Sequence, residues 1–207
     1  MMVMVKVCGI TRREDAEAAV AAGASAIGFV FVPASPRYVT PETAAELGRG
    51  LDVLKVGVFA DESPASIEAV MRAAQLDVAQ VYGGDLPKVP RVWRAVRVRE
   101  IQVVFRLGQA PATAPIEVEA ILFDGPANGI TFDWNLARGL AKKVILAGGL
   151  NASNVAEAIR IAQPWGVDAS SGLESAPGVK DHEKVRQFVK AALDAERAHR
   201  RESVVRG

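Results

Sequence analysis

The sequence has a single cysteine, almost no net charge and no long apolar run. A lone cysteine cannot form an intramolecular disulfide, so the fold does not require an oxidising compartment. Because 25 Lys and Arg residues nearly balance 24 Asp and Glu residues, we expect no general attraction to nucleic acid or to an anionic membrane. The longest apolar runs, such as 26–36, are too short to span a bilayer, and a secretory signal is not expected. These features predict a cytoplasmic protein.

Short apolar segments rich in Val, Ile and Phe alternate with helical segments along the whole chain. Strands that are apolar at most positions are typical of a parallel sheet covered by helices. The expected strands are 3–7, 26–32, 53–59, 77–81, 92–98, 120–123, 143–146 and 166–169, and the clearest helices are 14–22, 41–49, 64–74, 151–162 and 184–196.

The signals at the helix ends differ in strength. Thr11 followed by Glu14 has the spacing of a capping box, and Pro41 suits the first turn of the next helix. The segment 98–118 should hold one helix, but it contains a glycine and two prolines that interrupt helices. The bounds of a helix in this segment are therefore not predicted.

Strands that alternate with helices, without a linker or a change of composition, predict a single-domain (β/α)8 TIM barrel. Residues 1–196 are expected to form the barrel, and the charged segment 197–207 is expected to fray as a C-terminal tail. A doubly wound open sheet is the alternative, because the same alternation occurs in that fold.

In a barrel, catalytic groups lie where the strands end at the C-terminal face. Side chains alternate along a strand, so Lys6 and Cys8 share one face of the first strand, and their apolar neighbours share the other. This parity directs Lys6 and Cys8 into the barrel. Lys6 and the start of the following helix at Thr11 should favour a thiolate at Cys8. From its position alone, Cys8 could equally be a buried structural cysteine.

Two further charged residues follow expected strands. Arg37 comes after a stiff loop with two prolines, and a fixed guanidinium suits capture of a carboxylate or phosphate. Asp124 ends the sixth strand after four apolar residues, and it is either catalytic or a cap for the next loop. A solvated surface position is the alternative for Arg37.

The loops after the seventh and eighth strands carry the strongest local signal. Gly148 and Gly149 allow a close approach of the backbone, and Asp168, Ser170 and Ser171 follow the eighth strand. Small residues with available N–H groups suit a phosphate dianion, and barrel enzymes commonly bind phosphate in these two loops. The sequence therefore predicts a phosphate site there.

Six segments, in this order, resemble the phosphoribosylanthranilate isomerase family of tryptophan biosynthesis along nearly the whole chain. They are 6–11 (KVCGIT), 35–39 (SPRYV), 131–134 (TFDW), 145–150 (ILAGGL), 167–174 (VDASSGLE) and 177–181 (PGVKD). The resemblance implies an Amadori rearrangement of N-(5′-phosphoribosyl)anthranilate, a small phosphorylated substrate, without a metal or an organic cofactor.

The resemblance also implies roles for individual residues. Cys8 is the expected general base, Asp124 the expected general acid, and Arg37 the expected ligand of the anthranilate carboxylate. The phosphate would bind at the loops of Gly148, Gly149, Ser170 and Ser171, while Asp168 would partner Lys6 or a substrate hydroxyl. Because an acid must be protonated near neutrality to donate, we expect a raised pKa for Asp124, and we expect Cys8 to be at least partly ionised in the complex with substrate.

Two segments depart from the family pattern. Tyr82 stands in 81–83, where the family usually has Leu-His-Gly, and the loop 125–130 is shorter than is common. The alternatives are a different barrel enzyme, such as an epimerase or an indole-forming synthase, and a non-catalytic phosphoribosyl-binding module. An epimerase or a synthase commonly needs a metal-binding set of His and Asp residues or a Lys and Glu pair, whereas the only two histidines of this sequence lie near its C-terminus. The presence of both Cys8 and Asp124 argues against a non-catalytic module. The oligomeric state is left open between monomer and homodimer.

Overall fold

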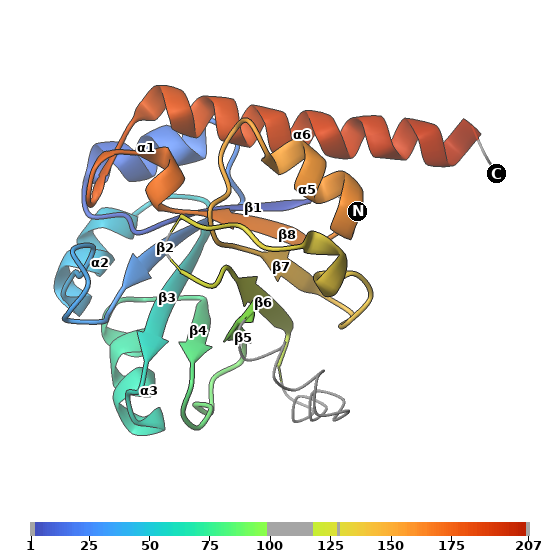
Figure 1. Cartoon of the computed structure of the whole chain (residues 1–207). Helices are drawn as coiled ribbons and strands as arrows, with labels where there is room; N and C mark the ends of the chain where they lie inside the picture. Colours follow the sequence, from blue (N-terminus) through green and yellow to red (C-terminus); the bar gives the residue numbers. More distant parts are fainter. Residues whose placement is uncertain (1–2, 99–117, 128, 206–207) are drawn as a thin grey trace.

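The protein forms a closed parallel barrel in a computed structural model that describes residues 3–98, 118–127 and 129–205 (Figure 1). Each strand pairs with the next one along the chain, and β8 pairs with β1 to close the ring. The strands are β1 (Met4–Cys8), β2 (Ala26–Val30), β3 (Leu54–Ala60), β4 (Val78–Tyr82), β5 (Val92–Arg97), β6 (Ala120–Asp124), β7 (Val144–Leu146) and β8 (Gly166–Ala169). The predicted barrel is confirmed, and the open-sheet alternative is wrong because β1 and β8 are joined by hydrogen bonds.

Helices cover the outside of the barrel (Figure 1). The outward residues Val5 and Val7 of β1, with Val3 just before it, belong to the large apolar cluster shared with the helices, whereas Met4 belongs to a separate cluster inside the barrel. The helices are α1 (Arg13–Ala21), α2 (Pro41–Gly48), α3 (Pro64–Ala73), α5 (Val155–Ala162) and α6 (His182–Val205), with short 3-10 turns η1 (Trp134–Ala137) and η2 (Ser171–Leu173).

The helix starts agree only in part with the prediction. Thr40 caps α2 by accepting a hydrogen bond from the Thr43 N–H, and Pro41 occupies the first turn. The predicted capping box at Thr11 is wrong: Arg12 precedes α1 without a side-chain cap, and the Thr11 hydroxyl instead donates to the carbonyl of Gly178 at 2.5 Å. Thr11 therefore ties the loop after β1 to a distant hairpin.

That hairpin was not predicted. It consists of β9 (Glu174–Ala176) and β10 (Val179–Lys180), which pair antiparallel between η2 and α6. The carboxylate of Asp15 in α1 is buried and accepts a hydrogen bond from the Lys180 N–H at 3.0 Å. Its other oxygen lies 2.8 Å from His182 Nε2, with which it pairs. The hairpin is thus fastened to α1 and to the start of α6.

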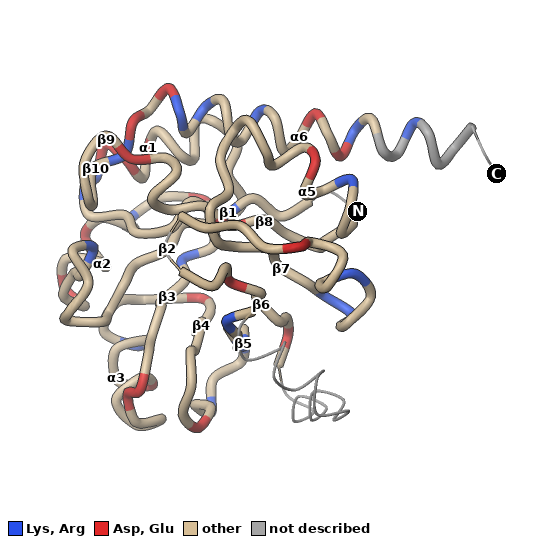
Figure 2. Tube along the Cα trace, viewed as in Figure 1, with Lys and Arg blue, Asp and Glu red and all other residues tan. Residues whose placement is uncertain are grey.

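Two expected helix boundaries change. The helix expected from residue 151 begins only at Val155, because the side chains of Asn151 and Asn154 hydrogen-bond the local backbone and hold a turn there. α6 continues to Val205, so residues 197–205 extend the same helix past the barrel. Acidic and basic residues alternate along the part of α6 that lies over the barrel (Figure 2). Most of the segment 98–118 lies outside the described residues. None of the helices described here is long and apolar enough to cross a membrane.

Candidate active site

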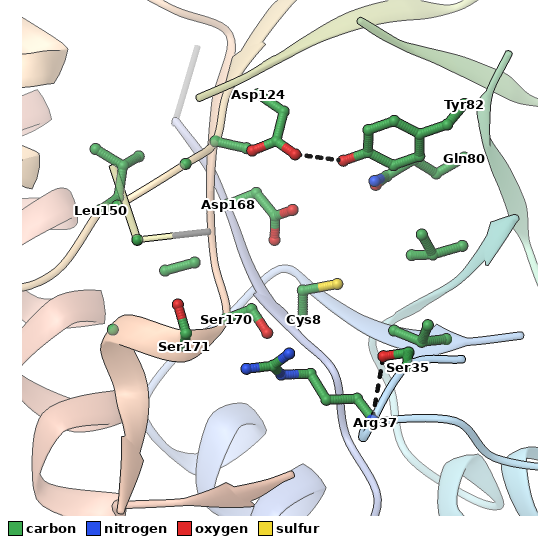
Figure 3. A pocket seen from close by; sticks show the side chains of 18 residues that line it. Cys8, Ser35, Arg37, Gln80, Tyr82, Asp124, Leu150, Asp168, Ser170 and Ser171 are labelled. Carbon is green, nitrogen blue, oxygen red and sulfur yellow. Dashed lines mark hydrogen bonds between the residues drawn. The ribbon is translucent and has the colours of Figure 1, made fainter. Parts of the chain in front are cut away.

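A pocket opens at the C-terminal ends of the strands (Figure 3). It brings together every residue that the sequence singled out for chemistry or binding. Those residues are Cys8, Arg37, Asp124, Gly148, Gly149, Asp168, Ser170 and Ser171, and the pocket is also lined by Val30, Val58, Gln80 and Tyr82. In the close-up, the Asp124–Tyr82 pair lies at one end, Arg37 at the other, and Cys8 and Asp168 between them.

Cys8 is the last residue of β1 and points into the barrel, as strand parity predicts. Its thiol packs with Val30 and Val58 and is only 8% exposed. Gly28 on the neighbouring strand makes this possible, because a Cβ there would lie 2.8 Å from Cys8 Sγ. Neighbouring side chains thus hold the thiol in one place at the barrel mouth.

The predicted activation of Cys8 is wrong for the free protein. Burial raises the pKa of the Cys8 thiol above its ordinary value of 9.0, and the charge and hydrogen bonding of Lys6 lower it by less. The helix that follows β1 begins at Arg13, five residues beyond Cys8, and a helix dipole acts mainly on groups at its first turn. Desolvation therefore dominates, and the resting group is a neutral thiol.

Lys6 and Asp168 form an ion pair beneath Cys8. Lys6 Nζ donates to Asp168 Oδ2 at 2.8 Å, and the Lys6 side chain is fully buried. The pair follows from the register, in which Lys6 of β1 lies beside Asp168 of β8. Burial alone would lower the pKa of Lys6, but Asp168 raises it, so the ammonium is kept charged. The expected partnership of Asp168 with Lys6 is thus observed.

The second oxygen of Asp168 is free to bind a ligand. Asp168 Oδ1 is buried and has no hydrogen-bond partner among the described residues, and Asp168 lines the pocket. The same holds for Oε1 of Gln80, which lines the pocket from β4. Buried acceptors without partners are costly, so both oxygens suit the hydroxyl or N–H groups of a bound molecule.

Asp124 ends β6 and meets a phenol. Tyr82 Oη donates to Asp124 Oδ2 at 3.0 Å across the barrel mouth (Figure 3). Burial raises the pKa of Asp124 above its ordinary value of 3.8; the hydrogen bond from Tyr82 lowers it, and the charge of Asp168 raises it again. The net direction is upward, as predicted for a group that donates a proton.

Arg37 is fixed by a carboxylate from the hairpin. Its Nε and Nη2 each donate to Glu174 at 2.7 Å, and Lys180 Nζ donates to the same carboxylate at 2.9 Å. The Lys180 ammonium also donates to the Ser170 carbonyl at 3.2 Å. This network holds the guanidinium against the pocket wall and excludes the alternative of a freely solvated Arg37.

The paired glycines serve the packing of two loops. Gly148 has a φ of +83°, and a Cβ there would lie 2.2 Å from the Gly125 nitrogen. Any other residue would therefore push the loop after β7 away from the loop after β6, which begins beside Asp124. The close approach brings the Gly148–Gly149 backbone next to the acid and into the same pocket.

The predicted site did not include Gln80, Tyr82, Glu174 or Lys180, whose polar groups line the pocket or hold Arg37. Strand parity could have found the first two, because they share the inward face of β4 and lie at its C-terminal end. Nothing in the spacing of Glu174 and Lys180 predicts their contacts with Arg37. Among the described residues, no group of three or more His, Cys, Asp or Glu side chains is arranged to hold a metal ion.

Comparison with known proteins gives one consistent family. The sequence model of the N-(5′-phosphoribosyl)anthranilate (PRA) isomerase family matches residues 5–191. A curated N-(5′-phosphoribosyl)anthranilate isomerase of Solibacter usitatus is 49% identical over 202 residues, covering 93% of this chain and 98% of the relative.

Solved structures agree with the sequence comparison. The phosphoribosyl anthranilate isomerase of Thermotoga maritima superimposes with a TM-score of 0.80 at 37% identity, covering 92% of this chain and 98% of that one. A further structure from that organism describes the enzyme as dimeric. A complex of the isomerase with reduced 1-(o-carboxyphenylamino)-1-deoxyribulose 5-phosphate superimposes with a TM-score of 0.77 at 37% identity, covering 92% and 98% of the two chains. The chain therefore belongs to the N-(5′-phosphoribosyl)anthranilate isomerase family and is a TIM-barrel isomerase of tryptophan biosynthesis.

Proposed function

We propose that Cys8 and Asp124 are the base and the acid with which this chain converts N-(5′-phosphoribosyl)anthranilate to 1-(2-carboxyphenylamino)-1-deoxyribulose 5-phosphate. One observation carries this assignment: a thiol and a carboxyl group with a raised pKa line a single pocket from the ends of β1 and β6. An Amadori rearrangement needs one group that gives a proton and one that takes a proton on the same substrate.

The first step opens the sugar ring. Asp124 gives its proton to the furanose oxygen, the bond from this oxygen to C1′ breaks, and the anilino nitrogen supplies the electron pair for a C1′=N bond. The product is a cationic Schiff base, and Asp124 is left as a carboxylate. Burial favours the protonated acid before this step, and the Tyr82 hydrogen bond stabilises the carboxylate after it.

The second step removes the C2′ proton. Cys8 takes this proton as a thiolate, and the electron pair of the C2′–H bond moves to neutralise the nitrogen and form an enolamine. A proton is then delivered to C1′, the enol O–H at C2′ releases its proton, and C2′ becomes the ketone. The resting thiol must ionise first, and the positive charge of the Schiff base adds to that of Lys6 in favouring the thiolate.

The ends of the substrate would bind on either side of this pair. The part of the Arg37 guanidinium that does not bind Glu174 would take the anthranilate carboxylate. The backbone of Gly148 and Gly149, with that of Ser170 and Ser171, would hold the phosphate. Asp168 Oδ1, which is buried without a partner in the described structure, would accept a hydrogen bond from a sugar hydroxyl.

The remaining expectations complete the proposal. The rearrangement moves protons within one substrate and needs no oxidant, so a metal or organic cofactor is not part of the mechanism. We assign the barrel to residues 1–196 and treat 197–207 as a C-terminal extension. A cytoplasmic enzyme, either monomeric or homodimeric, fits the composition, and a related enzyme is described as dimeric.

The loss of anthranilate fluorescence on mixing with freshly prepared phosphoribosylanthranilate tests the assignment. Wild-type protein should turn over, whereas Cys8→Ala and Asp124→Ala should each lose roughly 10²- to 10⁴-fold in kcat, as expected for a missing base or acid. Circular dichroism should find both variants folded. Activity that survives both substitutions would contradict the acid–base assignment, and binding without turnover by the wild type would indicate a non-catalytic module.

A further inference from the structure

Tyr82 is a half-buried polar residue for which the proposed reaction has no chemical step. It is one of only two tyrosines in the chain, and it ends β4 just inside the barrel mouth. Its hydroxyl donates to Asp124 Oδ2 at 3.0 Å, and both side chains line the pocket (Figure 3). A phenol held on the proposed acid can act on the reaction through that acid.

The strand register explains how Tyr82 reaches Asp124. Tyr82 of β4 pairs with Ala95 of β5, which in turn pairs with Leu122 of β6, two residues before Asp124. These residues share the inward face because aligned residues of parallel strands point the same way. The methyl side chain of Ala95 leaves room above it, so the phenol can pass over β5 and meet the carboxyl group two residues further along β6.

The ring of Tyr82 is held by apolar contacts on its other side. It packs against the cluster of Cys8, Val30 and Val58. One rigid ring therefore touches the neighbourhood of the proposed base and hydrogen-bonds the proposed acid. Packing fixes the position of the ring, and the hydrogen bond from its hydroxyl thereby restricts the orientation of the Asp124 carboxyl group.

We propose that Tyr82 is a positioning residue that fixes the Asp124 carboxyl group, so that its Oδ1 oxygen presents the proton to the substrate. The inference rests on the proposed role of Asp124 as the acid. An Oδ2 atom that accepts the phenol hydrogen is the unprotonated oxygen, which leaves the acidic proton on Oδ1. A Cβ on Gly148 would lie 3.1 Å from Oδ1, so Oδ1 faces the glycine loop proposed to hold the phosphate.

The hydrogen bond between Tyr82 and Asp124 affects the pKa of Asp124, so its loss can be measured in a pH profile. Burial keeps the pKa of Tyr82 well above 10, with the charges of Asp124, Asp168 and Cys8 acting in the same direction, so the phenol remains a donor. Besides burial, Asp124 is affected by hydrogen bonds from Tyr82 and the Gly125 N–H and by the charge of Arg97, which lower its pKa, and by the charge of Asp168, which raises it. Removing the phenol hydroxyl should therefore raise the pKa of Asp124.

The acidic limb of the pH profile of kcat/KM reports the pKa of Asp124. The active form needs protonated Asp124 and ionised Cys8, whose ordinary pKa values are 3.8 and 9.0. Below the pKa of Asp124, further acidification removes thiolate without adding protonated acid, so kcat/KM falls. The midpoint of this acidic limb therefore equals the pKa of Asp124 in the free enzyme.

Tyr82→Phe tests the inference because it keeps the ring and removes only the hydroxyl. We expect the midpoint of the acidic limb to move to higher pH. We also expect kcat to fall about ten-fold, the lower end for a lost hydrogen bond to a charged group, with little change in KM. Thermal unfolding should show a cooperative transition for Tyr82→Phe as for the wild type, as expected for a variant that is still folded. Tyr82→His, which restores an N–H donor, should bring the midpoint back below that of Tyr82→Phe.

Tyr38→Phe is the matched control, because Tyr38 is the other tyrosine, is 42% exposed and does not line the pocket. It should leave the profile unchanged. A Tyr82→Phe profile whose acidic midpoint coincides with that of the wild type would overturn the inference. If Asp124→Ala is inactive in that experiment, the proposed acid stands and only the role of Tyr82 fails; if Asp124→Ala is active, both proposals fail.

Discussion

At the scale of single residues, the site contains a thiol that its buried surroundings keep neutral in the free protein. Burial acts on Cys8 more strongly than the ammonium of Lys6 does. Lys6 is itself largely neutralised by Asp168, at 2.8 Å, so it offers little net positive charge to the sulfur. A neutral resting thiol is less reactive towards oxidants and electrophiles than a thiolate would be.

The alkylation of Cys8 by iodoacetamide as a function of pH measures this directly. Because Cys8 is the only cysteine, the modified protein reports one group. Burial should place the midpoint above the ordinary thiol value of 9.0, and the same protein unfolded in guanidinium chloride should titrate near the ordinary value. A native midpoint at or below that of the unfolded chain would show that Lys6 outweighs desolvation.

At the scale of elements, the β9–β10 hairpin connects the pocket to the outer helices. Glu174 of β9 binds Arg37 in the loop after β2, and Lys180 of β10 donates a hydrogen bond to the same Glu174 carboxylate. Asp15 of α1 accepts from the Lys180 backbone. The hairpin is short, but through these side chains it fixes the residue proposed to bind the anthranilate carboxylate.

Glu174→Gln should weaken this connection. The Glu174 side chain is 6% exposed and that of Lys180 is fully buried, and breaking a buried pair from one side costs about 3 kcal/mol or more of unfolding free energy. Its partners lower the pKa of Glu174 from 4.5 despite burial. The stabilisation should therefore be present above the unfolded pKa and lost as pH falls through the folded pKa.

Chemical unfolding of both proteins near neutral pH and in acid checks this prediction. The difference between wild type and Glu174→Gln should be largest near neutrality and shrink in acid. Glu183→Gln is the matched control, because Glu183 pairs with Arg186 on the surface, with both side chains more than half exposed, and should change stability by less than about 1 kcal/mol. Equal effects of the two substitutions would contradict the role given to Glu174.

At the scale of the whole molecule, the sequence determines the elements better than their closure. The alternation of apolar strands and helices predicts the strands to within one or two residues at their ends. It does not distinguish a barrel from an open sheet, because closure depends on hydrogen bonds between β1 and β8, which are far apart in the chain. Strands that alternate with helices without a linker or a change of composition favoured the barrel, and the pairing of β1 with β8 decides between it and the open sheet.

Part of the candidate site could likewise be predicted from local sequence, and part of it depends on contacts between distant strands. Strand parity alone places Lys6 and Cys8 inside the barrel, because it depends on neighbours in sequence. The bond from Tyr82 to Asp124 joins β4 to β6 over the small residue Ala95, and no local pattern contains it. The raised pKa of Cys8 in the free protein could not be predicted, because the sequence identifies the charge of Lys6 but not the degree of burial.

The pH dependence of wild-type kcat/KM tests the central claim, that Asp124 and Cys8 act as acid and base in one pocket. With the pKa of Asp124 raised from 3.8 and that of Cys8 raised from 9.0, activity should rise to a plateau above the pKa of Asp124 and fall only above that of Cys8. The basic midpoint should match the alkylation midpoint of Cys8. A basic limb well below that midpoint, or a profile without an acidic limb, would contradict the account.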